Sequence, residues 1–386
     1  MRKRKRYIAI VCIYILLSAL CSGCGFRLTP YYLREMVLDT SPLLYGSEGS
    51  DNSLLVIEKN NRFGYADTTG KVVIKPVYDD ARPFHEGLAA VQKGGKYGYI
   101  DITGKVVIPF QYYGAADFHN GLALVGGRVV SVGETDTPRI SIINARGTVL
   151  KETDYSSLFA FSDGVALVGA DNGQRAYLDH SGKEIASYQY SRSRVDRQRG
   201  FPTFSEGLAP FDTGNGKYAH IDVTGRIVFD SGCISADPFS EGLAAVIFRE
   251  EEGYGYIDRT GKTVIQPAYG MAEPFGEGLA CVFTEKERWS VIDKTGQKVI
   301  DLPDEVAWPR TFSEGLCAVG KRNLEKRQIY YAEDIFDWGF IDTTGKLVID
   351  FQYDMVSPFK NGIAQVLVDG KIGYIDKAGK YIWEPK

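Results

Sequence analysis

The strongest constraint on the fold of this 386-residue chain is a short pattern that recurs nine times along it. Each copy reads aromatic, small residue, aromatic, Ile, Asp, x, Thr, Gly, Lys, as in Tyr97–Lys105. The copies are 34, 43, 35, 43, 36, 35, 49 and 34 residues apart, and their turns begin at Asp67, Asp101, Asn144, Asp179, Asp222, Asp258, Asp293, Asp342 and Asp376. A unit of about 35 residues with a few insertions is typical of a tandem repeat fold.

A second pattern, Phe-x-Glu/Asp/Asn-Gly-Leu-Ala, precedes eight of the copies, starting at Phe84, Phe118, Phe161, Phe204, Phe239, Phe275, Phe312 and Phe359. The first unit instead begins directly with a strand at Leu54–Ile57. In the best unit we expect strands at Leu88–Gln92, Tyr97–Asp101 and Lys105–Ile108. A crossing segment such as Pro76–Asp79 then leads to the next Phe. The 43 Gly and 24 Tyr residues agree with aromatic-rich strands joined by tight turns.

The Asp-x-Thr-Gly element has a sufficient structural cause. An Asp at the first position of a type I turn accepts a hydrogen bond from the backbone N–H two residues on, and the Gly takes a left-handed conformation beside a bulge. A calcium site is the alternative interpretation of these recurring carboxylates. Each carboxylate stands alone, however, without the clustered oxygen ligands that calcium requires. We therefore predict turns at these positions and no metal site.

These patterns predict an all-β protein of nine tandem antiparallel repeats with three to four strands each. A three-stranded unit cannot bury its own faces, so the units must pack on one another. A propeller-like ring is favoured because the segment from Tyr78 to Phe84 can supply a short fourth strand. An open β-solenoid is the alternative, because nine units exceed the usual number of blades and about 35 residues is lean for a four-stranded blade.

The N-terminus carries the features of an export signal. Five basic residues, Arg2–Arg6, precede an apolar run at Tyr7–Leu20 that is too short to span a bilayer comfortably. The next residues, Leu20–Gly25, resemble the lipobox of bacterial lipoproteins, with Cys21 where that motif usually carries leucine. The resemblance implies a lipoprotein signal peptide at 1–23, lipid attachment at Cys24, a linker at 24–52 and the repeat array at 53–386. We expect the protein in the bacterial cell envelope, anchored by its lipid on the extracytoplasmic face of an inner or outer membrane.

The net charge bears on the class of partner, and the cysteine count bears on disulfide bonding. Cleavage removes five positive charges and no negative ones, so the formal net charge falls from −4 to −9, which disfavours nucleic acid. Cys233, Cys281 and Cys317 remain besides Cys24, and an odd count argues against a disulfide framework. Cys281 and Cys317 are offset by one position in the first strands of their units, so strand alternation places them on opposite faces. We interpret them as small buried residues rather than a bridge or a metal pair.

The three insertions are expected on one rim of the array. Gly126–Pro138 and Lys321–Asp337 lengthen the first hairpin of their units, and Ser191–Pro202 extends the exit from a third strand. In an antiparallel unit these positions share the end opposite the Thr-Gly turns. Aromatic and arginine side chains are enriched at interface hot spots, so the candidate partner-binding residues are Arg192, Arg194, Arg197, Arg199, Tyr330, Tyr331, Phe336 and Trp338. The alternative is that the insertions are merely tolerated, solvated loops.

The combined pattern resembles the WG repeat family of bacterial exported proteins, named for its Trp-Gly dipeptide. The dipeptide occurs literally at Trp338-Gly339, while Phe63-Gly64, Tyr97-Gly98 and Tyr254-Gly255 keep an aromatic residue followed by Gly. The resemblance covers about residues 53–386. It implies a tandem β-repeat fold and transfers no catalytic residues to this chain.

We predict a non-catalytic, membrane-anchored module that binds a protein or glycan partner through the loop rim, without a cofactor. The histidines, His85, His119, His180 and His220, occupy ordinary repeat positions, and the repeat array has no Cys-x-x-Cys, His-Glu-x-x-His or Gly-x-Ser-x-Gly motif. A propeller-type hydrolase acting on glycan is the second hypothesis, and it would need two carboxylates about 5 to 9.5 Å apart. A passive structural spacer is the third.

Overall fold

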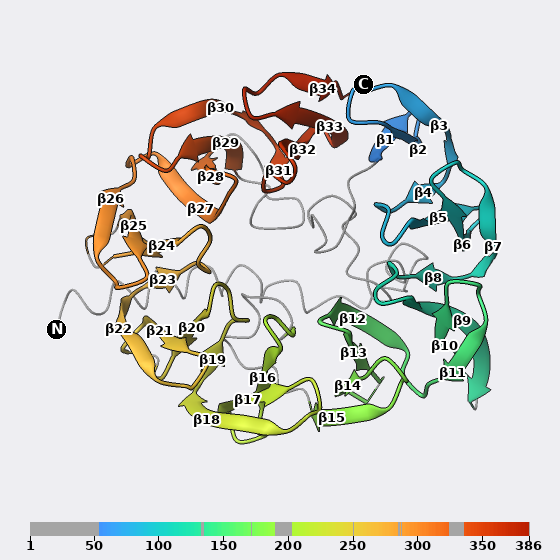
Figure 1. Cartoon of the computed structure of the whole chain (residues 1–386), viewed down its shortest axis with the longest axis horizontal. Coiled ribbons are helices and arrows are strands. Elements are labelled where there is room, and N and C mark those ends of the chain that lie inside the picture. Colours follow the sequence, from blue (N-terminus) through green and yellow to red (C-terminus); the bar gives the residue numbers. More distant parts are fainter. Residues whose placement is uncertain are drawn as a thin grey trace, which may run out of the picture. The chain divides into compact units, whose positions relative to one another are not determined.

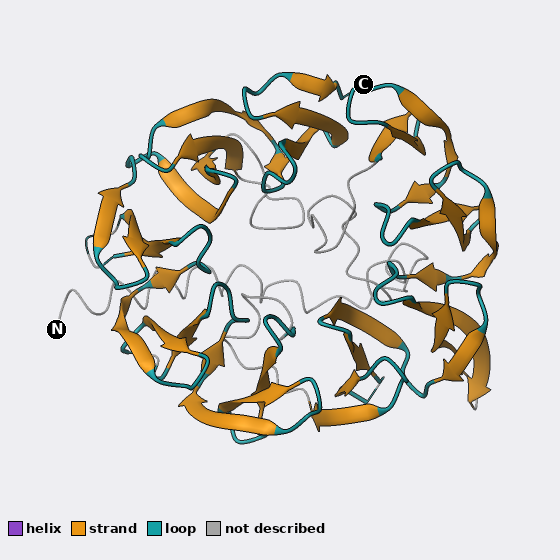
Figure 2. Ribbon diagram, in the orientation of Figure 1, coloured by secondary structure: helices purple, strands orange, loops and turns teal. Residues whose placement is uncertain are grey.

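A computed structural model describes residues 54–385, apart from 133–134, 171, 190–202, 250, 285, 287 and 324–335. All of these residues belong to one compact unit, residues 37–386. Every regular element among them is a β-strand (Figure 2). The strands form nine separate antiparallel sheets, seven of four strands and two of three. The predicted all-β class and the nine repeats are confirmed.

Each sheet is one blade, and in the seven four-stranded blades the chain runs from an inner strand through a hairpin to an outer strand. The inner strands are β4 (Asp80–Ala81), β8 (Gly114–Ala115), β12 (Ser157–Ser162), β19 (Ser235–Ala236), β23 (Met271–Ala272), β27 (Val306–Ser313) and β31 (Met355–Val356). The first hairpin strands are β1 (Leu55–Lys59), β5 (Leu88–Lys93), β9 (Leu122–Val132), β13 (Val165–Gly169), β16 (Leu208–Asp212), β20 (Leu243–Ile247), β24 (Leu279–Phe283), β28 (Leu316–Arg322) and β32 (Ile363–Val368).

The other two strands complete each blade. The second hairpin strands are β2 (Arg62–Ala66), β6 (Lys96–Asp101), β10 (Thr135–Asn144), β14 (Gln174–Leu178), β17 (Tyr218–Asp222), β21 (Tyr254–Asp258), β25 (Trp289–Asp293), β29 (Phe336–Asp342) and β33 (Lys371–Asp376). The outer strands are β3 (Val72–Tyr78), β7 (Val106–Tyr112), β11 (Val149–Glu152), β15 (Glu184–Gln189), β18 (Ile227–Cys233), β22 (Thr263–Tyr269), β26 (Lys298–Asp301), β30 (Leu347–Tyr353) and β34 (Tyr381–Trp383). Blades are numbered 1 to 9 along the chain, and blades 1 and 5 have three described strands.

The nine blades follow one another around a ring, with the outer strands on the perimeter (Figure 1). Blade 9 lies beside blade 1, where Leu55 packs with Ile372 and Tyr374. Tyr374 also hydrogen-bonds the backbone of Val56 across this seam. Among the described residues no strand is exchanged between the two blades, so side-chain packing closes the ring. The fold is therefore a nine-bladed β-propeller, as favoured from the sequence, and the open solenoid is wrong.

Adjacent blades pack through two aromatic positions of the repeat. At six blade boundaries of the described residues, the ring two positions before the turn Asp contacts the Phe of the next unit. The ring centroids of Tyr99 and Phe118 are 4.8 Å apart, and those of Tyr256 and Phe275 are 4.9 Å apart. The hydroxyl of Tyr99 also donates a hydrogen bond to the carbonyl of Ala116 in the next blade, at 2.7 Å. All four of these rings are buried. At these boundaries the contact uses one residue from each of the two sequence patterns.

The Asp-x-Thr-Gly segments form the predicted turns. In blade 2 the carboxylate of Asp101 accepts the N–H of Thr103 at 2.9 Å and the hydroxyl of Thr103 at 2.6 Å. Gly104 has a φ of 84°, in the left-handed region. The hydroxyl of Thr103 is the main cause that lowers the pKa of Asp101. Each carboxylate is thus held by the turn that it builds.

The Glu-Gly dipeptide of the second pattern makes a different turn, which also joins neighbouring blades. Glu241 and Gly242 both have positive φ, 53° and 82°, as in the two-residue type I′ turn of tight hairpins. The carboxylate of Glu241 accepts the N–H groups of Glu277 at 2.6 Å and Gly278 at 2.8 Å, in the same turn of blade 7. We call this contact the carboxylate clasp. Further clasps run from Glu86 to Gly121, Asp163 to Gly207, Glu206 to Gly242, Glu277 to Gly315 and Glu314 to Gly362.

The residue after the first aromatic residue of each hairpin is small because the outer strand passes close over it. A Cβ built on Gly98 would lie 2.6 Å from the carbonyl oxygen of Ile108. Here β7 bulges, so Gly98 has no register partner, and the same bulge faces Gly64, Gly255 and Gly339. Blades 3, 4, 5 and 7 carry Ser or Ala at this position, and there the residue is paired in register, as Ser290 is with Asp301.

The predicted crossing segment Pro76–Asp79 needs correction. Pro76 and Tyr78 belong to the outer strand β3, in which Tyr78 pairs with Phe63. The proline is tolerated because β3 is an edge strand, so its missing N–H costs no ladder hydrogen bond. The crossing itself is limited to Asp79, and the predicted short fourth strand follows at once as β4.

Candidate partner-binding face

The two faces of the ring are built from different connections. The turn face carries the Asp-x-Thr-Gly and Glu-Gly turns, and the loop face carries the tips of the first hairpins and the ends of the outer strands. The β9–β10 hairpin is paired out to Val132 and Thr135, β28 and β29 are paired out to Arg322 and Phe336, and β15 ends at Gln189. All three positions open on the loop face, because strands in an antiparallel sheet alternate in direction.

Most of the predicted site residues lie outside the described residues. These are Cys24, Arg192, Arg194, Arg197, Arg199, Tyr330 and Tyr331. Of the strands beside the two insertions, β15 ends at Gln189, β28 ends at Arg322 and β29 begins at Phe336, all at the loop face. The placement of the six rim residues on a partner-binding surface therefore stays a prediction.

Phe336 and Trp338 lie in the interior of blade 8 instead of on a rim. Each side chain is 2% exposed. Phe336 packs 6.2 Å from Trp308 between ring centroids, and the guanidinium of Arg310 lies 5.1 Å from the centroid of the Trp338 ring. Alternation along β29 places both residues on the same, inward side of the hairpin. The structure thus places both side chains in the blade interior instead of on the exposed rim expected from the sequence.

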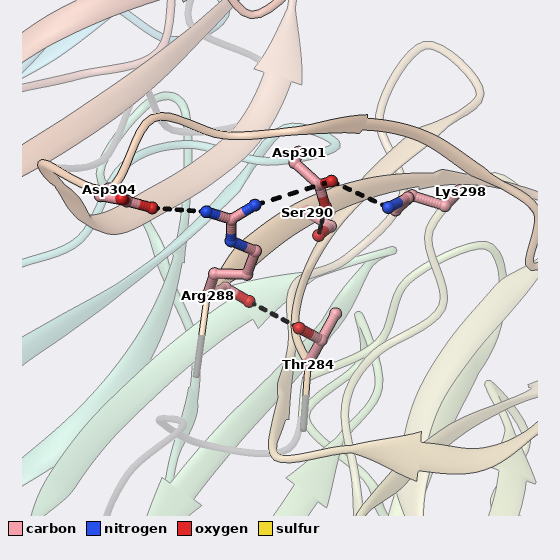
Figure 3. Close-up of polar contacts among 6 residues, drawn as sticks. All are labelled: Thr284, Arg288, Ser290, Lys298, Asp301 and Asp304. Carbon is pink, nitrogen blue, oxygen red and sulfur yellow. Dashed lines mark hydrogen bonds and ion pairs between the residues drawn. The ribbon is translucent and has the colours of Figure 1, made fainter. Parts of the chain in front are cut away.

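The loop-face edge of blade 7 carries a network of charged side chains (Figure 3). Arg288 lies 2.7 Å from Asp304 and 3.8 Å from Asp301, and Lys298 lies 2.8 Å from Asp301. The hydroxyl of Ser290 donates to Asp301 at 2.7 Å. The ammonium of Lys298 is the main cause that lowers the pKa of Asp301. Exposed ion pairs contribute little to stability, so this network mainly keeps the edge charged and solvated.

The turn face, by contrast, is occupied by contacts between blades. In three blades the residue after the turn Asp is a cation that reaches the clasp glutamate of the preceding blade. Arg259 donates to the carbonyl of Glu206 at 2.7 Å, and Lys294 donates to that of Glu241 at 2.9 Å; Lys377 and Glu314 repeat the contact at 2.9 Å. From the sequence, no role is assigned to these glutamates, although their recurrence before Gly indicates a shared structural function.

Two histidines, His85 and His220, lie buried at ordinary repeat positions, as predicted. His85 is 1% exposed, with Nε2 3.5 Å from Asp117 and its ring centroid 5.2 Å from that of His119, at the boundary of blades 2 and 3. His220 replaces the buried tyrosine of other copies and stacks on Phe229 at 4.6 Å. Burial lowers the pKa of His220 to about 4. His220 is therefore neutral near pH 7 and enclosed by the blades.

The other features that bear on function are possible metal ligands, membrane-spanning helices and cysteine thiols. Within the described ranges, no group of three or more His, Cys, Asp or Glu side chains is arranged to hold a metal ion. In the same part of the chain, no helix is long and apolar enough to cross a membrane. Cys233, Cys281 and Cys317 are buried free thiols, which confirms the predicted burial.

This geometry defines a nine-bladed β-propeller built from tandem hairpin repeats. The WG containing repeat family matches the chain at four places, residues 63–97, 97–126, 254–286 and 338–371. These matches begin in blades 1, 2, 6 and 8, the four in which Gly faces an outer-strand bulge. The chain thus contains WG repeats, and blades 3, 4, 5 and 7 are versions in which Ser or Ala replaces the glycine and is paired in register with the outer strand.

Solved structures with the same kind of fold are similar to this chain at low sequence identity. A eukaryotic initiation factor is 12% identical, covers 84% of this chain and 93% of its own, and has a TM-score of 0.55. BamB from Moraxella catarrhalis is 11% identical over 85% and 92%, with a TM-score of 0.38. The C-terminal WD40 domain of Sif2 is 11% identical over 75% and 92%, with a TM-score of 0.41. No curated protein matches the sequence.

Proposed function

We propose that this chain is a non-catalytic propeller that binds a protein or glycan partner through its loop face while a lipid on Cys24 holds it at the extracytoplasmic face of a bacterial membrane. The anchor is supported by the basic and apolar segments Arg2–Arg6 and Tyr7–Leu20 and the cysteines that follow them. The single observation that carries the binding role is that all three insertions open on one face.

A division of labour between the two faces supports this proposal. On the turn face, glutamates and cations are used in the carboxylate clasps, so changes there act on the stability of the ring. On the loop face, hairpin tips of different lengths extend from a common scaffold. Insertions on one side of a repeat array are where binding surfaces usually form. The arginines of segment 191–202 and the tyrosines Tyr330 and Tyr331 provide side chains suited to an interface.

The proposal is tested with three shortened variants. The two hairpin insertions are each replaced by the Gly94-Gly95 turn of blade 2, and the insertion at 191–202 is replaced by a direct link. Partner capture is then measured by crosslinking in intact cells. We expect at least one variant to lose partner capture about tenfold, with the thermal midpoint within a few degrees of the parent. A Lys105→Ala variant is the matched control, because Lys105 is exposed on the turn face and hydrogen-bonds in its turn through its backbone N–H and carbonyl, which alanine keeps. Unchanged capture in all three shortened variants would contradict the proposal. A Cys24→Ala variant separates membrane retention from binding.

A further inference from the structure

At several blade boundaries, two residues from the first hairpin strands of adjacent blades are buried in the same hydrophobic cluster. Counted from the residue after the Gly of the Glu-Gly turn, they are the third residue of one blade and the second residue of the next. Both residues are alanine and buried at three boundaries: Ala90 with Ala123, Ala245 with Ala280, and Ala318 with Ala364. Small residues on both sides allow the strands to approach closely.

At the boundary of blades 7 and 8, both of these positions are cysteine. Cys281 is the third residue of its strand and Cys317 the second of the next, and both are 0% exposed within one cluster that also contains Val291 and Val319. The offset by one position, which places them on opposite faces of their own sheets, makes them face each other once the sheets are stacked. Cys317 also donates a hydrogen bond to the carbonyl of Arg310 at 3.0 Å.

We propose that Cys281 and Cys317 form a disulfide that joins blade 7 to blade 8 when the array folds in the presence of a low-molecular-weight disulfide. One cysteine thiolate attacks the small disulfide and releases one small thiol. The other thiolate then attacks the resulting mixed disulfide, forming the Cys281–Cys317 bond and releasing the second small thiol. The two protons lost by the cysteines are taken up by the two released thiols, so the small disulfide is the oxidant. This inference is independent of partner binding at the loop face.

Folding, rather than the finished ring, is the stage at which the reaction proceeds. The thiol of Cys317 and burial both raise the pKa of Cys281 well above its usual value, so Cys281 holds little thiolate in the folded ring. Before blade 8 docks, both thiols are open to an oxidant. Among the cysteines of the described residues, Cys233 lies in a different cluster, so it keeps its thiol free when the other two are joined.

The test is to unfold the full chain and refold it with oxidised glutathione or with a reductant, and then to map each cysteine by alkylation and mass spectrometry. We expect a linked peptide pair containing Cys281 and Cys317, an alkylatable Cys233, and a thermal midpoint about 5 °C higher in the oxidised form. Reduction should remove the difference. Free thiols at both positions after oxidative refolding, or glutathione adducts without the linked pair, would overturn the proposal.

The repeat itself supplies variants that should fold. Cys281→Ala and Cys317→Ala introduce the residue that blades 2 and 6 carry at both of these positions. Each should abolish the difference between oxidised and reduced thermal midpoints, whereas Cys233→Ser should keep it. A midpoint difference that persists in Cys281→Ala would show that another pair is responsible and would also reject the proposal.

Discussion

At the scale of single residues, the WG repeat glycine is fixed by its distance to the outer strand. Gly98 lies under the carbonyl of Ile108, at the point where β7 bulges around Pro109. Where the outer strand stays in register, as at Ser290, a side chain fits and its hydroxyl bonds to the neighbouring strand. In blades 1 to 8 the glycine therefore occurs where the outer strand bulges, and Ser or Ala occurs where it stays in register.

The first prediction concerns Gly98→Ala. The new Cβ would overlap the Ile108 carbonyl at 2.6 Å, so we expect the free energy of unfolding to fall by about 2 kcal/mol, as for an overpacked core site. Gly126→Ala is the matched control, because its Cβ would meet its nearest atom at 3.5 Å, an ordinary contact. Urea unfolding followed by tryptophan fluorescence measures both. Equal stability of the two variants would show that the bulge does not determine the glycine.

A second residue-scale prediction concerns the pH dependence of stability. His220 has a pKa of about 4 when folded because of burial, against about 6.5 when unfolded. Between these values the unfolded chain binds a proton that the folded chain does not, so stability falls as the pH drops from about 6.5 to 4, by about 3 kcal/mol in total. His220→Tyr restores the residue of other blades and should flatten this dependence.

A control variant, His220→Phe, separates the effect of histidine protonation on stability from that of the tyrosine hydroxyl. In other blades the tyrosine hydroxyl donates to the next blade, as Tyr256 does to the carbonyl of Glu273 at 2.7 Å. His220→Phe should flatten the pH profile without this hydrogen bond, so it should be less stable than His220→Tyr at pH 7. A profile in which both variants keep the parent's loss between pH 6.5 and 4 would reject the role of His220.

At the scale of elements, the carboxylate clasp compensates for a strained turn. A glutamate with φ near 53° is in a region that non-glycine residues rarely occupy. Its carboxylate accepts two N–H groups of the next blade and lies 3.1 Å from the ammonium of Lys294 in the case of Glu241. Hydrogen bonds to a charged acceptor are stronger than neutral ones. The turn conformation is thereby used to connect neighbouring blades.

The third prediction uses Glu241→Asn. Asparagine tolerates the left-handed turn, as Asn120 and Asn361 do at the same repeat position, but its shorter side chain loses the clasp. We expect a loss of about 1–2 kcal/mol in unfolding free energy, measured by urea unfolding at pH 7. Glu252→Asn, which removes only an exposed ion pair with Arg249, is the control and should cost less than about 0.5 kcal/mol.

The clasp also has a defined pH window. Burial acts to raise the pKa of Glu241, but the N–H of Gly278 and the ammonium of Lys294 outweigh it, and the net pKa is lowered. The contribution is therefore present above the ordinary pKa of glutamate, about 4.3, and is lost as the pH falls through the lower folded value. The difference between the parent and Glu241→Asn should shrink below pH 4. A difference that is constant from pH 7 to pH 3 would contradict an ionised clasp.

At the scale of the whole molecule, the features that could be predicted from the sequence are the local ones. The Asp turns, the nine units and the short fourth strand follow from turn chemistry and strand alternation within one unit. Pairing between units could not be predicted, because it depends on which faces meet after stacking. For this reason strand alternation places Cys281 and Cys317 on opposite faces without showing that they meet. The long insertion suggests a rim position for Phe336 and Trp338, although their hairpin turns them inward. A proline argues against a central strand, and the sequence does not show that the strand of Pro76 lies at an edge.

The central claim is that the nine blades close into a ring, and paired spin labels test it most directly. Lys71→Cys is combined with Tyr381→Cys at the seam, with Lys105→Cys in the neighbouring blade 2, or with Arg226→Cys in blade 5, in a background in which the native cysteines are replaced by alanine. The ring predicts a distance from 71 to 381 similar to that from 71 to 105, because Gly70 lies against the backbone of Ile382, and a longer distance from 71 to 226. A distance from 71 to 381 that is the longest of the three would contradict the ring.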